Sequence, residues 1–296
     1  MSDLVSVIIP SYNHKKYIIE LLRSIRLQSY QNIEIIVVDD GSIDGSVELL
    51  TALQNDYQFK LIVKNNEGLC ATINRGLDEV CGEYVVIIAS DDFMPSKRIE
   101  EQVSKLSGSQ FDAISGGMTI VSEDSQVLKY LAPLKVGEVF FEDMLKRNLI
   151  FAPTVMFKAE TFTKFGKYNI QYVVEDYSLW LKILSKNGRI GIYDYNWAYY
   201  RKNPELTRTK MEWYFAGLIQ VLSDYNSNPS VTKAIKNSAF KYYIKVALFD
   251  GYEVLKNIKL KTESKFLPAL NGMQLAVIYM VMMMPSYLKR VLQKYL

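Results

Sequence analysis

Two adjacent carboxylates, Asp91 and Asp92, follow directly after the short apolar run Tyr84–Ile88. The run is bounded by Gly82 and by a polar turn, which predicts a strand buried on both faces. Carboxylates at the carboxyl end of such a strand lie where open α/β sheets bind ligands. They are hard oxygen donors suited to Mg²⁺ or Mn²⁺ that also takes substrate phosphates. Asp-Asp is also ordinary turn chemistry, so its surroundings must decide between a metal site and a surface turn.

Further candidate residues follow the other predicted strands. Asp40 closes the strand Ile33–Val38, where its carboxylate can bind a base edge or a ribose hydroxyl, or form an Asx turn with Gly41. Tyr12 can stack on a base or can be a half-buried loop aromatic. His14 is the only histidine, which argues against histidine-based metal sites and triads, and in its polar loop we expect it to be solvated.

Two more constellations lie later in the chain. Asp176 opens a predicted helix in EDYSLW, where it is suited to act as a general base with Glu175 orienting it or the acceptor. A plain helix-capping carboxylate is the alternative. The basic stretch from Tyr199 through Arg208 can close over a pyrophosphate, since arginine forms a bidentate fork with phosphate oxygens. Its alternative is a solvated loop.

The elements that position these residues alternate between strands and helices. The pattern predicts strands at Val5–Pro10, Ile33–Val38, Lys60–Val63 and Tyr84–Ile88, separated by helices at Lys16–Gln28, Val47–Leu53 and Leu69–Val80. This is an α/β arrangement with a mostly parallel, Rossmann-like sheet flanked by helices. The polar clusters at the strand ends are then expected to line one crevice.

The later part of the chain is less regular. Further strands are expected at Ala113–Val121, Val155–Phe157, Arg189–Asp194 and Trp197–Arg201, with helices at Ser96–Leu106, Tyr177–Leu184, Trp213–Tyr225, Val231–Lys256 and Gln274–Lys294. We place the domain boundary near Thr209. A catalytic domain spans residues 1–209, with a nucleotide half of about 1–110 and an acceptor half of about 111–209, and residues 210–296 form a C-terminal α-helical extension.

Charge is unevenly distributed along the 296 residues. The segment from Asn226 to Leu296 has 11 Lys and Arg against 3 Asp and Glu, a net charge of +8, which leaves −5 for the rest. The stretch Met273–Met284 is apolar but too short to span a bilayer, and Ser286–Leu296 has apolar residues at helical spacing with cations between them. We expect this tail to contact an anionic membrane surface, with packing on the catalytic domain or on a second copy of the chain as the alternative. The overall charge of +3 alone predicts no nucleic-acid partner.

Six segments in order resemble inverting glycosyltransferases of family 2, which have the GT-A fold: VSVIIPSYNHKKYI, IEIIVVDDGSIDGS, NNEGLCATINRGL, GEYVVIIASDD, EDYSLWLKI and YYRKNPELTRT. They cover about the first two-thirds of the chain, and six motifs in sequence are far more specific than one. By this resemblance Asp92 binds Mg²⁺ or Mn²⁺ with Asp91, and Asp176 is the base. The nucleotide-binding positions that it implies are Pro10, Ser11, Tyr12, Asp40, Asn66, Asp91, Arg201 and Arg208.

The chain departs from the family pattern at two places. Ala89 stands where many members have the first Asp of Asp-x-Asp-Asp, and Thr72-Ile73-Asn74 replaces Ala-Arg-Asn, so the family's arginine is missing from its place. The metal pair is retained. Arg75 is the next basic residue, and its role stays open.

The function that the resemblance implies is transfer of a sugar from a UDP-sugar to a saccharide acceptor linked to polyprenyl diphosphate. Such enzymes assemble bacterial surface polysaccharide or O-antigen in the cytoplasm, peripherally bound to the inner face of the membrane. A non-catalytic nucleotide-sugar-binding module is one alternative, against which the intact Asp91, Asp92 and Asp176 argue. A nucleotidyltransferase is another, but it would need a glycine-rich loop after the first strand, and PSYNHKK has none.

Overall fold

The computed structural model describes residues 3–202, 208–250, 277, 280 and 281. Internal contacts divide the chain into two units. The first comprises residues 1–171 and 175–205, and the second comprises residues 172–174 and 206–296. Each unit is described by itself.

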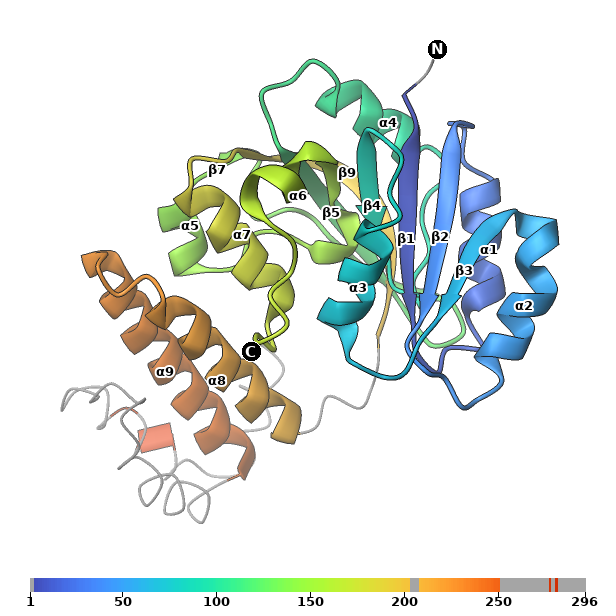
Figure 1. Ribbon diagram of the computed structural model, residues 1–296. Helices are drawn as coiled ribbons and strands as arrows, with labels where there is room; N and C mark the ends of the chain where they lie inside the picture. Colours follow the sequence, from blue (N-terminus) through green and yellow to red (C-terminus); the bar gives the residue numbers. More distant parts are fainter. Residues whose placement is uncertain (1–2, 203–207, 251–276, 278–279, 282–296) are drawn as a thin grey trace. The chain divides into compact units, whose positions relative to one another are not determined.

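A nine-stranded sheet forms the centre of the described part of the first unit. Its first half is parallel, in the order β3-β2-β1-β4, and confirms the predicted Rossmann-like arrangement (Figure 1). Its strands are β1 (Val5–Ser11), β2 (Ile33–Asp39), β3 (Phe59–Val63) and β4 (Tyr84–Ile87). The intervening helices are α1 (Ile18–Arg26), α2 (Ser46–Tyr57), α3 (Leu69–Leu77) and, after β4, α4 (Arg98–Leu106). Parallel pairing brings the carboxyl ends of these strands to one edge of the sheet.

The second half of the sheet is mixed. Next to β4 it continues with β8 (Met156–Lys158), β5 (Ala113–Val121), β9 (Ile190–Arg201) and β7 (Gly137–Val139), and β6 (Val127–Leu131) pairs with β5. The remaining elements are α5 (Phe141–Lys146), a 3₁₀ turn (Ala152–Thr154), α6 (Glu160–Phe165) and α7 (Glu175–Ser185). The two strands expected between Arg189 and Arg201 are one continuous strand, whose register against β5 is irregular near Gly117. The elements β6, β7, α5 and α6 were not expected.

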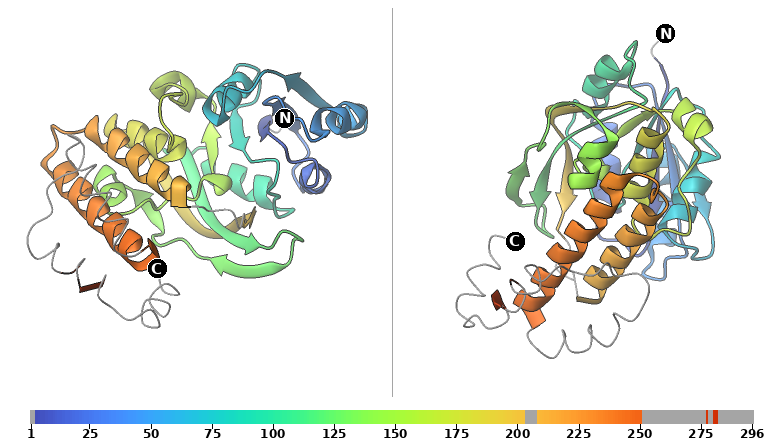
Figure 2. Two further views of the ribbon diagram at one scale, coloured as in Figure 1. Left: turned by 90° about the horizontal axis from the view of Figure 1, so that it is seen from below. Right: turned by 90° about the vertical axis from the view of Figure 1, so that its left-hand side faces the viewer.

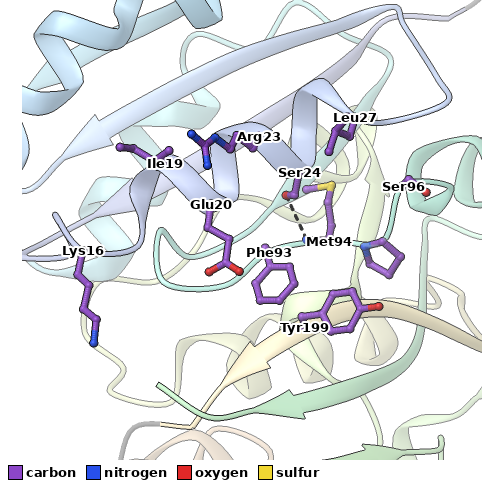
Figure 3. A pocket seen from close by; sticks show the side chains of 11 residues that line it. Lys16, Ile19, Glu20, Arg23, Ser24, Leu27, Phe93, Met94, Ser96 and Tyr199 are labelled. Carbon is purple, nitrogen blue, oxygen red and sulfur yellow. Dashed lines mark hydrogen bonds between the residues drawn. The ribbon is translucent and has the colours of Figure 1, made fainter. Parts of the chain in front are cut away.

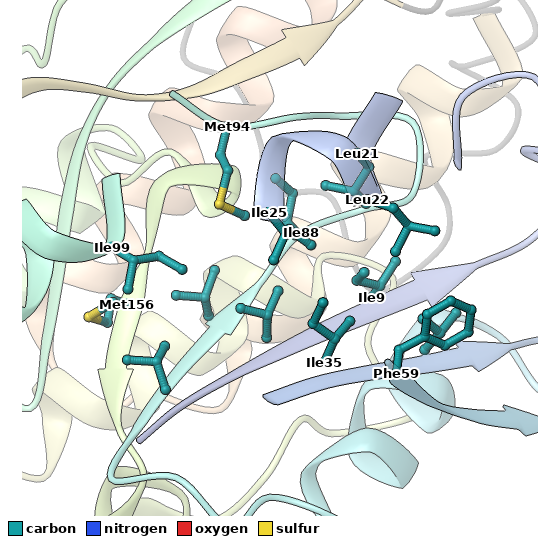
Figure 4. Packing of buried hydrophobic residues seen from close by; sticks show 14 of the residues in the cluster. Ile9, Leu21, Leu22, Ile25, Ile35, Phe59, Ile88, Met94, Ile99 and Met156 are labelled. Carbon is teal, nitrogen blue, oxygen red and sulfur yellow. The ribbon is translucent and has the colours of Figure 1, made fainter. Parts of the chain in front are cut away.

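The core of this unit follows from the hydrophobic pattern of α1 and β1. Apolar residues of α1 recur three and four positions apart, at Ile18, Leu21, Leu22 and Ile25, and all four are buried. They pack with alternate residues of the parallel strands, such as Ile9 (Figure 4). This packing holds α1 and β1 in place and so fixes both ends of the loop that joins them.

In the second unit, α8 (Arg208–Ser223) and α9 (Pro229–Asp250) lie side by side (Figure 2). Both helices were expected, but α8 begins five residues earlier than the predicted Trp213. The helix expected at Gln274–Lys294 lies outside the described residues. None of the helices within the described ranges is long and apolar enough to cross a membrane.

Candidate active site

The carboxyl ends of β1, β2 and β4 meet through backbone hydrogen bonds. The N–H of Asp40 donates to the carbonyl of Ser11 at 2.9 Å, and the N–H of Ser90 donates to the carbonyl of Pro10 at 3.3 Å. Pro10 and Ser11 are buried in β1, whereas Tyr12 is 45% exposed. The predicted nucleotide-binding positions of β1 and β2 are therefore neighbours, and Tyr12 has an accessible ring.

Asp40 is buried and shapes the loop that carries Asn66. Its carboxylate accepts hydrogen bonds from the N–H groups of Glu67, at 2.9 Å, and Gly68, at 3.0 Å, and from Lys64. Burial by itself would raise the pKa of Asp40, but these bonds outweigh it and lower the pKa. The carboxylate of Asp40 thus faces the Asn66 loop, whereas the neighbouring Asp39 accepts a hydrogen bond from the Ser42 N–H at 2.8 Å. Asn66 is exposed at the same edge.

Asp92 is buried, with 2% of its surface exposed, while the side chain of Asp91 is 22% exposed. The Arg201 N–H donates to Asp92 Oδ1 at 2.9 Å. Burial and the adjacent charge of Asp91 raise the pKa of Asp92 well above its usual range, against the opposing influence of Arg201 and Arg98. The alternative of a plain surface turn does not fit a carboxylate this deeply buried.

The carboxylate pair suits a divalent cation. Two neighbouring carboxylates repel each other in a buried setting, and a cation between them and a phosphate would relieve that repulsion. In the described ranges, no group of three or more His, Cys, Asp or Glu side chains could hold a metal ion. Two carboxylates supply only part of an oxygen shell, so Mg²⁺ or Mn²⁺ held by Asp91 and Asp92 would take its remaining ligands from substrate phosphates and water.

Arg201 is the last residue of β9 and is 4% exposed, so it does not lie on the open loop expected from the sequence. Its guanidinium stacks over the ring of Tyr17, with 4.4 Å from the guanidinium carbon to the ring centre. It donates to the carbonyls of Asp91, Ser122 and Glu123 and to the side chains of Ser125 and Glu20. Protein acceptors thus surround all three of its nitrogens.

Arg208, the other arginine assigned to a closing loop, is the first residue of α8 in the second unit. Its side chain lies outside the described residues. Arg75 forms an ion pair with Glu79 one turn along the chain, and this pairing assigns it no part in the site. The loop that was expected to carry both Arg201 and Arg208 is therefore divided between a strand end and a helix start.

His14 was expected to be solvated, but it lies beside the carboxylate pair. Its Nδ1 is 2.9 Å from Ser90 Oγ and 3.7 Å from Asp91 Oδ1, and 31% of its side chain is exposed. The residue type alone, a single histidine in a polar loop, did not predict this position. The place of His14 just after β1 could have predicted it, because that strand ends at the same sheet edge as β4.

Glu175 and Asp176 begin α7 and are both partly buried. Burial raises the pKa of Asp176, and hydrogen bonds from the Tyr177 N–H, at 2.6 Å, and from Asn148 limit the shift. Burial together with the charge of Asp176 raises the pKa of Glu175 to about 7. Burial thus raises the pKa of both neighbouring carboxylates, and raised carboxylate pKa values are common at acid–base sites.

The segment before α7 is fixed by an unexpected contact. The side chain of Asn74 on α3 donates to the carbonyl of Tyr168 at 2.8 Å and accepts from its N–H at 3.0 Å. This double hydrogen bond ties α3, which starts near the Asp40 loop, to the stretch leading into Asp176. Asn74 is the part of the family's Ala-Arg-Asn pattern that this chain retains.

The pKa of Glu175 leads to a prediction about stability. The pKa of Glu175 in the folded protein, about 7, lies above the ordinary value of 4.5, so the folded state favours the protonated side chain. The resulting contribution to the free energy of unfolding is complete below about pH 4.5 and is lost as pH rises through 7. Glu175→Gln should therefore raise the free energy of unfolding by about 1–3 kcal/mol near pH 8.5 and leave it almost unchanged near pH 4.5. Denaturant unfolding at the two pH values measures this. Equal effects at both would show that Glu175 is not held in a desolvated setting.

A groove of about 600 Å³ lies along α1, and two of its residues, Glu20 and Phe93, contact Arg201. Side chains of α1 form one wall, and the segment Phe93–Ser96 with Tyr199 forms the other (Figure 3). The rings of Phe93 and Tyr199 are stacked, with centres 4.6 Å apart. Glu20 points from α1 toward Phe93 (Figure 3) and also bonds Arg201. One residue of the groove, Glu20, is thus linked through Arg201 to Asp91 and Asp92.

The fold matches that of GT-A glycosyltransferases. Staphylococcus aureus TarS 1–349, solved in complex with UDP-GlcNAc, superposes with a TM-score of 0.63 and 19% identity, over 83% of this chain and 73% of that one. The mannosyltransferase PcManGT of Pyrobaculum calidifontis, solved with GDP-Man and Mn²⁺, gives a TM-score of 0.63 at 18% identity, over 95% and 84% of the two chains.

The sequence comparisons identify the family. The model of glycosyl transferase family 2 matches residues 6–164, and the chain belongs to this family. An uncharacterized glycosyltransferase of Rickettsia felis is 34% identical over 188 residues, which are 61% of this chain and 31% of that protein, so the match spans less than a third of that relative. The putative teichuronic acid biosynthesis glycosyltransferase TuaG of Bacillus subtilis is 30% identical over 187 residues, 62% of this chain and 73% of TuaG.

Proposed function

We propose that this protein is an inverting glycosyltransferase that transfers a sugar from a UDP-sugar to a hydroxyl of a saccharide acceptor. The observation that carries the proposal is the pairing of Asp91 and Asp92 at the carboxyl edge of the parallel sheet, within a family 2 chain. Tyr12 and the Asp40 loop lie at the same edge and are assigned to the nucleotide. Asp176, at the start of α7, is assigned to the acceptor.

In the proposed reaction the acceptor hydroxyl gives its proton to Asp176 while its oxygen forms a bond to the anomeric carbon. The bond between that carbon and the diphosphate oxygen breaks, and UDP leaves with the electron pair. Because attack and departure take place on opposite faces, the anomeric configuration is inverted. A divalent metal bound at Asp91 and Asp92 would stabilise the charge of the leaving diphosphate. The raised pKa of Asp176 suits a group that must accept a proton.

Relatives and neighbours support the choice of donor and pathway. TarS was solved with UDP-GlcNAc, which supports a UDP-sugar donor, and TuaG is a putative teichuronic acid biosynthesis glycosyltransferase. PcManGT, solved with GDP-Man and Mn²⁺, supports a nucleotide-sugar donor and a divalent metal. We therefore propose a role in bacterial surface polysaccharide or O-antigen assembly, with an acceptor linked to polyprenyl diphosphate. A screen of UDP-, GDP- and dTDP-sugars with Mn²⁺, reading released nucleotide, tests this. We expect release from at least one UDP-sugar; binding without release would instead favour a non-catalytic module.

We also propose that the basic C-terminal tail contacts the inner face of the membrane. The support is its charge, +8 from residue 226 onward, and the absence of acidic residues after Glu263. The full chain should co-sediment with vesicles rich in anionic lipid, and binding should weaken as salt rises. A chain ending at Lys265 should lose this binding. If the full chain ignores anionic vesicles and the shortened chain only changes its oligomeric state, the tail is a contact between subunits.

A further inference from the structure

Arg201 joins three separate parts of the first unit. From the end of β9 its Nε donates to the Asp91 carbonyl at 2.8 Å, and its backbone N–H donates to Asp92 Oδ1 at 2.9 Å. Its Nη2 donates to Glu20 Oε2 on α1 at 2.6 Å. Its Nη1 reaches the turn between β5 and β6, through the carbonyls of Ser122, at 3.0 Å, and Glu123, at 2.6 Å.

Glu20 closes this arrangement from the side of α1. The same Oε2 that accepts from Arg201 also accepts from Ser125 Oγ at 2.8 Å, so it ties the β5–β6 turn to α1. Lys16 and Tyr17 bond Glu123 from the N-terminal side of α1 as well. The buried apolar face of α1 holds the helix against the sheet, which makes Glu20 a fixed anchor for Arg201.

We propose that Arg201 and Glu20 are positioning residues that hold Asp91 and Asp92 in the arrangement that binds the metal. This inference rests on the proposed function, because it assigns the carboxylates to a metal. It differs from the role implied by the resemblance, in which Arg201 contacts the diphosphate directly. The guanidinium is engaged by five protein acceptors, and freeing it for a ligand would break the hydrogen bond to the Asp91 carbonyl and those that anchor the arginine to α1 and to the β5–β6 turn.

The two roles predict opposite effects for Glu20. If Arg201 binds the diphosphate, removing Glu20 releases the guanidinium and leaves metal binding intact. If Arg201 positions the carboxylates, removing Glu20 loosens the arginine and weakens metal binding, although Glu20 itself lies on α1 outside the carboxylate pair. Glu20 therefore separates the two roles more sharply than any substitution of Arg201.

The test is Mn²⁺ binding to the full chain in saturating UDP, followed by the electron paramagnetic resonance signal of free Mn²⁺. We expect Glu20→Ala and Arg201→Met each to weaken Mn²⁺ binding by about tenfold, the effect of losing a charge-assisted hydrogen bond. Arg201→Lys should lie between, because an ammonium cannot reach all of the acceptors of a guanidinium. Arg26→Gln, an exposed arginine of α1, is the matched control and should not change binding.

Unchanged Mn²⁺ affinity in Glu20→Ala would overturn the inference. So would an Arg201→Met variant that loses UDP affinity in EDTA but keeps its Mn²⁺ affinity, since that pattern defines a diphosphate ligand. If Arg201→Met does not fold, the Mn²⁺ affinity of Glu20→Ala is sufficient to separate the two roles of Arg201. A wild-type protein that binds neither UDP nor Mn²⁺ would refute the proposed function itself, whereas normal wild-type binding with no effect of Glu20 would refute only this inference.

Discussion

Asp176→Asn is expected to reduce turnover by at least ~10²-fold while the Kd for UDP changes little. The substitution keeps the shape of the side chain and an oxygen that can accept the Tyr177 N–H, and asparagine caps helices about as well as aspartate. It removes the group that accepts the acceptor's proton. Transfer to an acceptor and UDP binding, measured side by side, give the required comparison.

The matched control for this variant is Asp124→Asn, which neutralises a carboxylate whose side chain is 84% exposed. It should transfer sugar at the wild-type rate. Normal turnover by Asp176→Asn would mean that Asp176 serves only the start of α7 and that the base lies elsewhere. A fall in UDP affinity equal to the fall in turnover would also contradict the assignment, because it would indicate a distorted donor site.

Removal of the metal is expected to abolish activity, and Asp92→Asn should have the same effect. EDTA should stop nucleotide release, and Mn²⁺ or Mg²⁺ should restore it in the wild type but not in the variant. A loss of ~10²-fold or more is the scale we expect when charge on the leaving group is no longer stabilised. Full activity in EDTA would contradict the metal assignment.

The Asp92→Asn variant should nevertheless fold, and the reason is the burial of Asp92, which the sequence did not predict. A surface turn was one of the two interpretations of Asp91-Asp92 from the sequence, but Asp92 is buried and its pKa is raised. A raised folded pKa means that ionised Asp92 costs stability as pH rises, so the neutral amide introduced by Asp92→Asn should not lower the unfolding temperature near pH 8. The amide oxygen can still accept the Arg201 N–H. A marked drop in unfolding temperature would show that ionised Asp92 stabilises the fold.

The parallel half of the sheet was predictable because β1, β2 and β4 are largely buried apolar runs and α1 has apolar residues at helical spacing. Ile33–Asp39 and Tyr84–Ile87 are largely apolar runs, and acidic residues lie at or shortly after the end of each. Strand β6 was not predictable, because four of its five residues are exposed and it therefore lacks the alternation of buried and exposed residues that marks a strand. Strand β7 was not predictable because its three residues are too few to show a pattern.

The candidate site was predictable in its residue types and not in its contacts. Asp91, Asp92 and Asp176 could be named from their places after a strand and at the start of a helix. The partners of Arg201 could not, because Glu20 is 181 positions away in the chain and Asp91 is 110 positions away. His14 was missed for the same reason: its neighbour Ser90 lies 76 positions away. Such pairings depend on strand order, which local patterns do not specify.

The proposed function is tested most directly by the anomeric configuration of the product. Proton NMR should follow the full chain with Mn²⁺ and the UDP-sugar selected by the nucleotide-release screen, with water or a saccharide as acceptor. An α-linked UDP-sugar should give a β-configured product before mutarotation, and the signal should vanish in EDTA. An α-configured first product, or product formed equally well in EDTA, would contradict metal-assisted single displacement with Asp176 as the base.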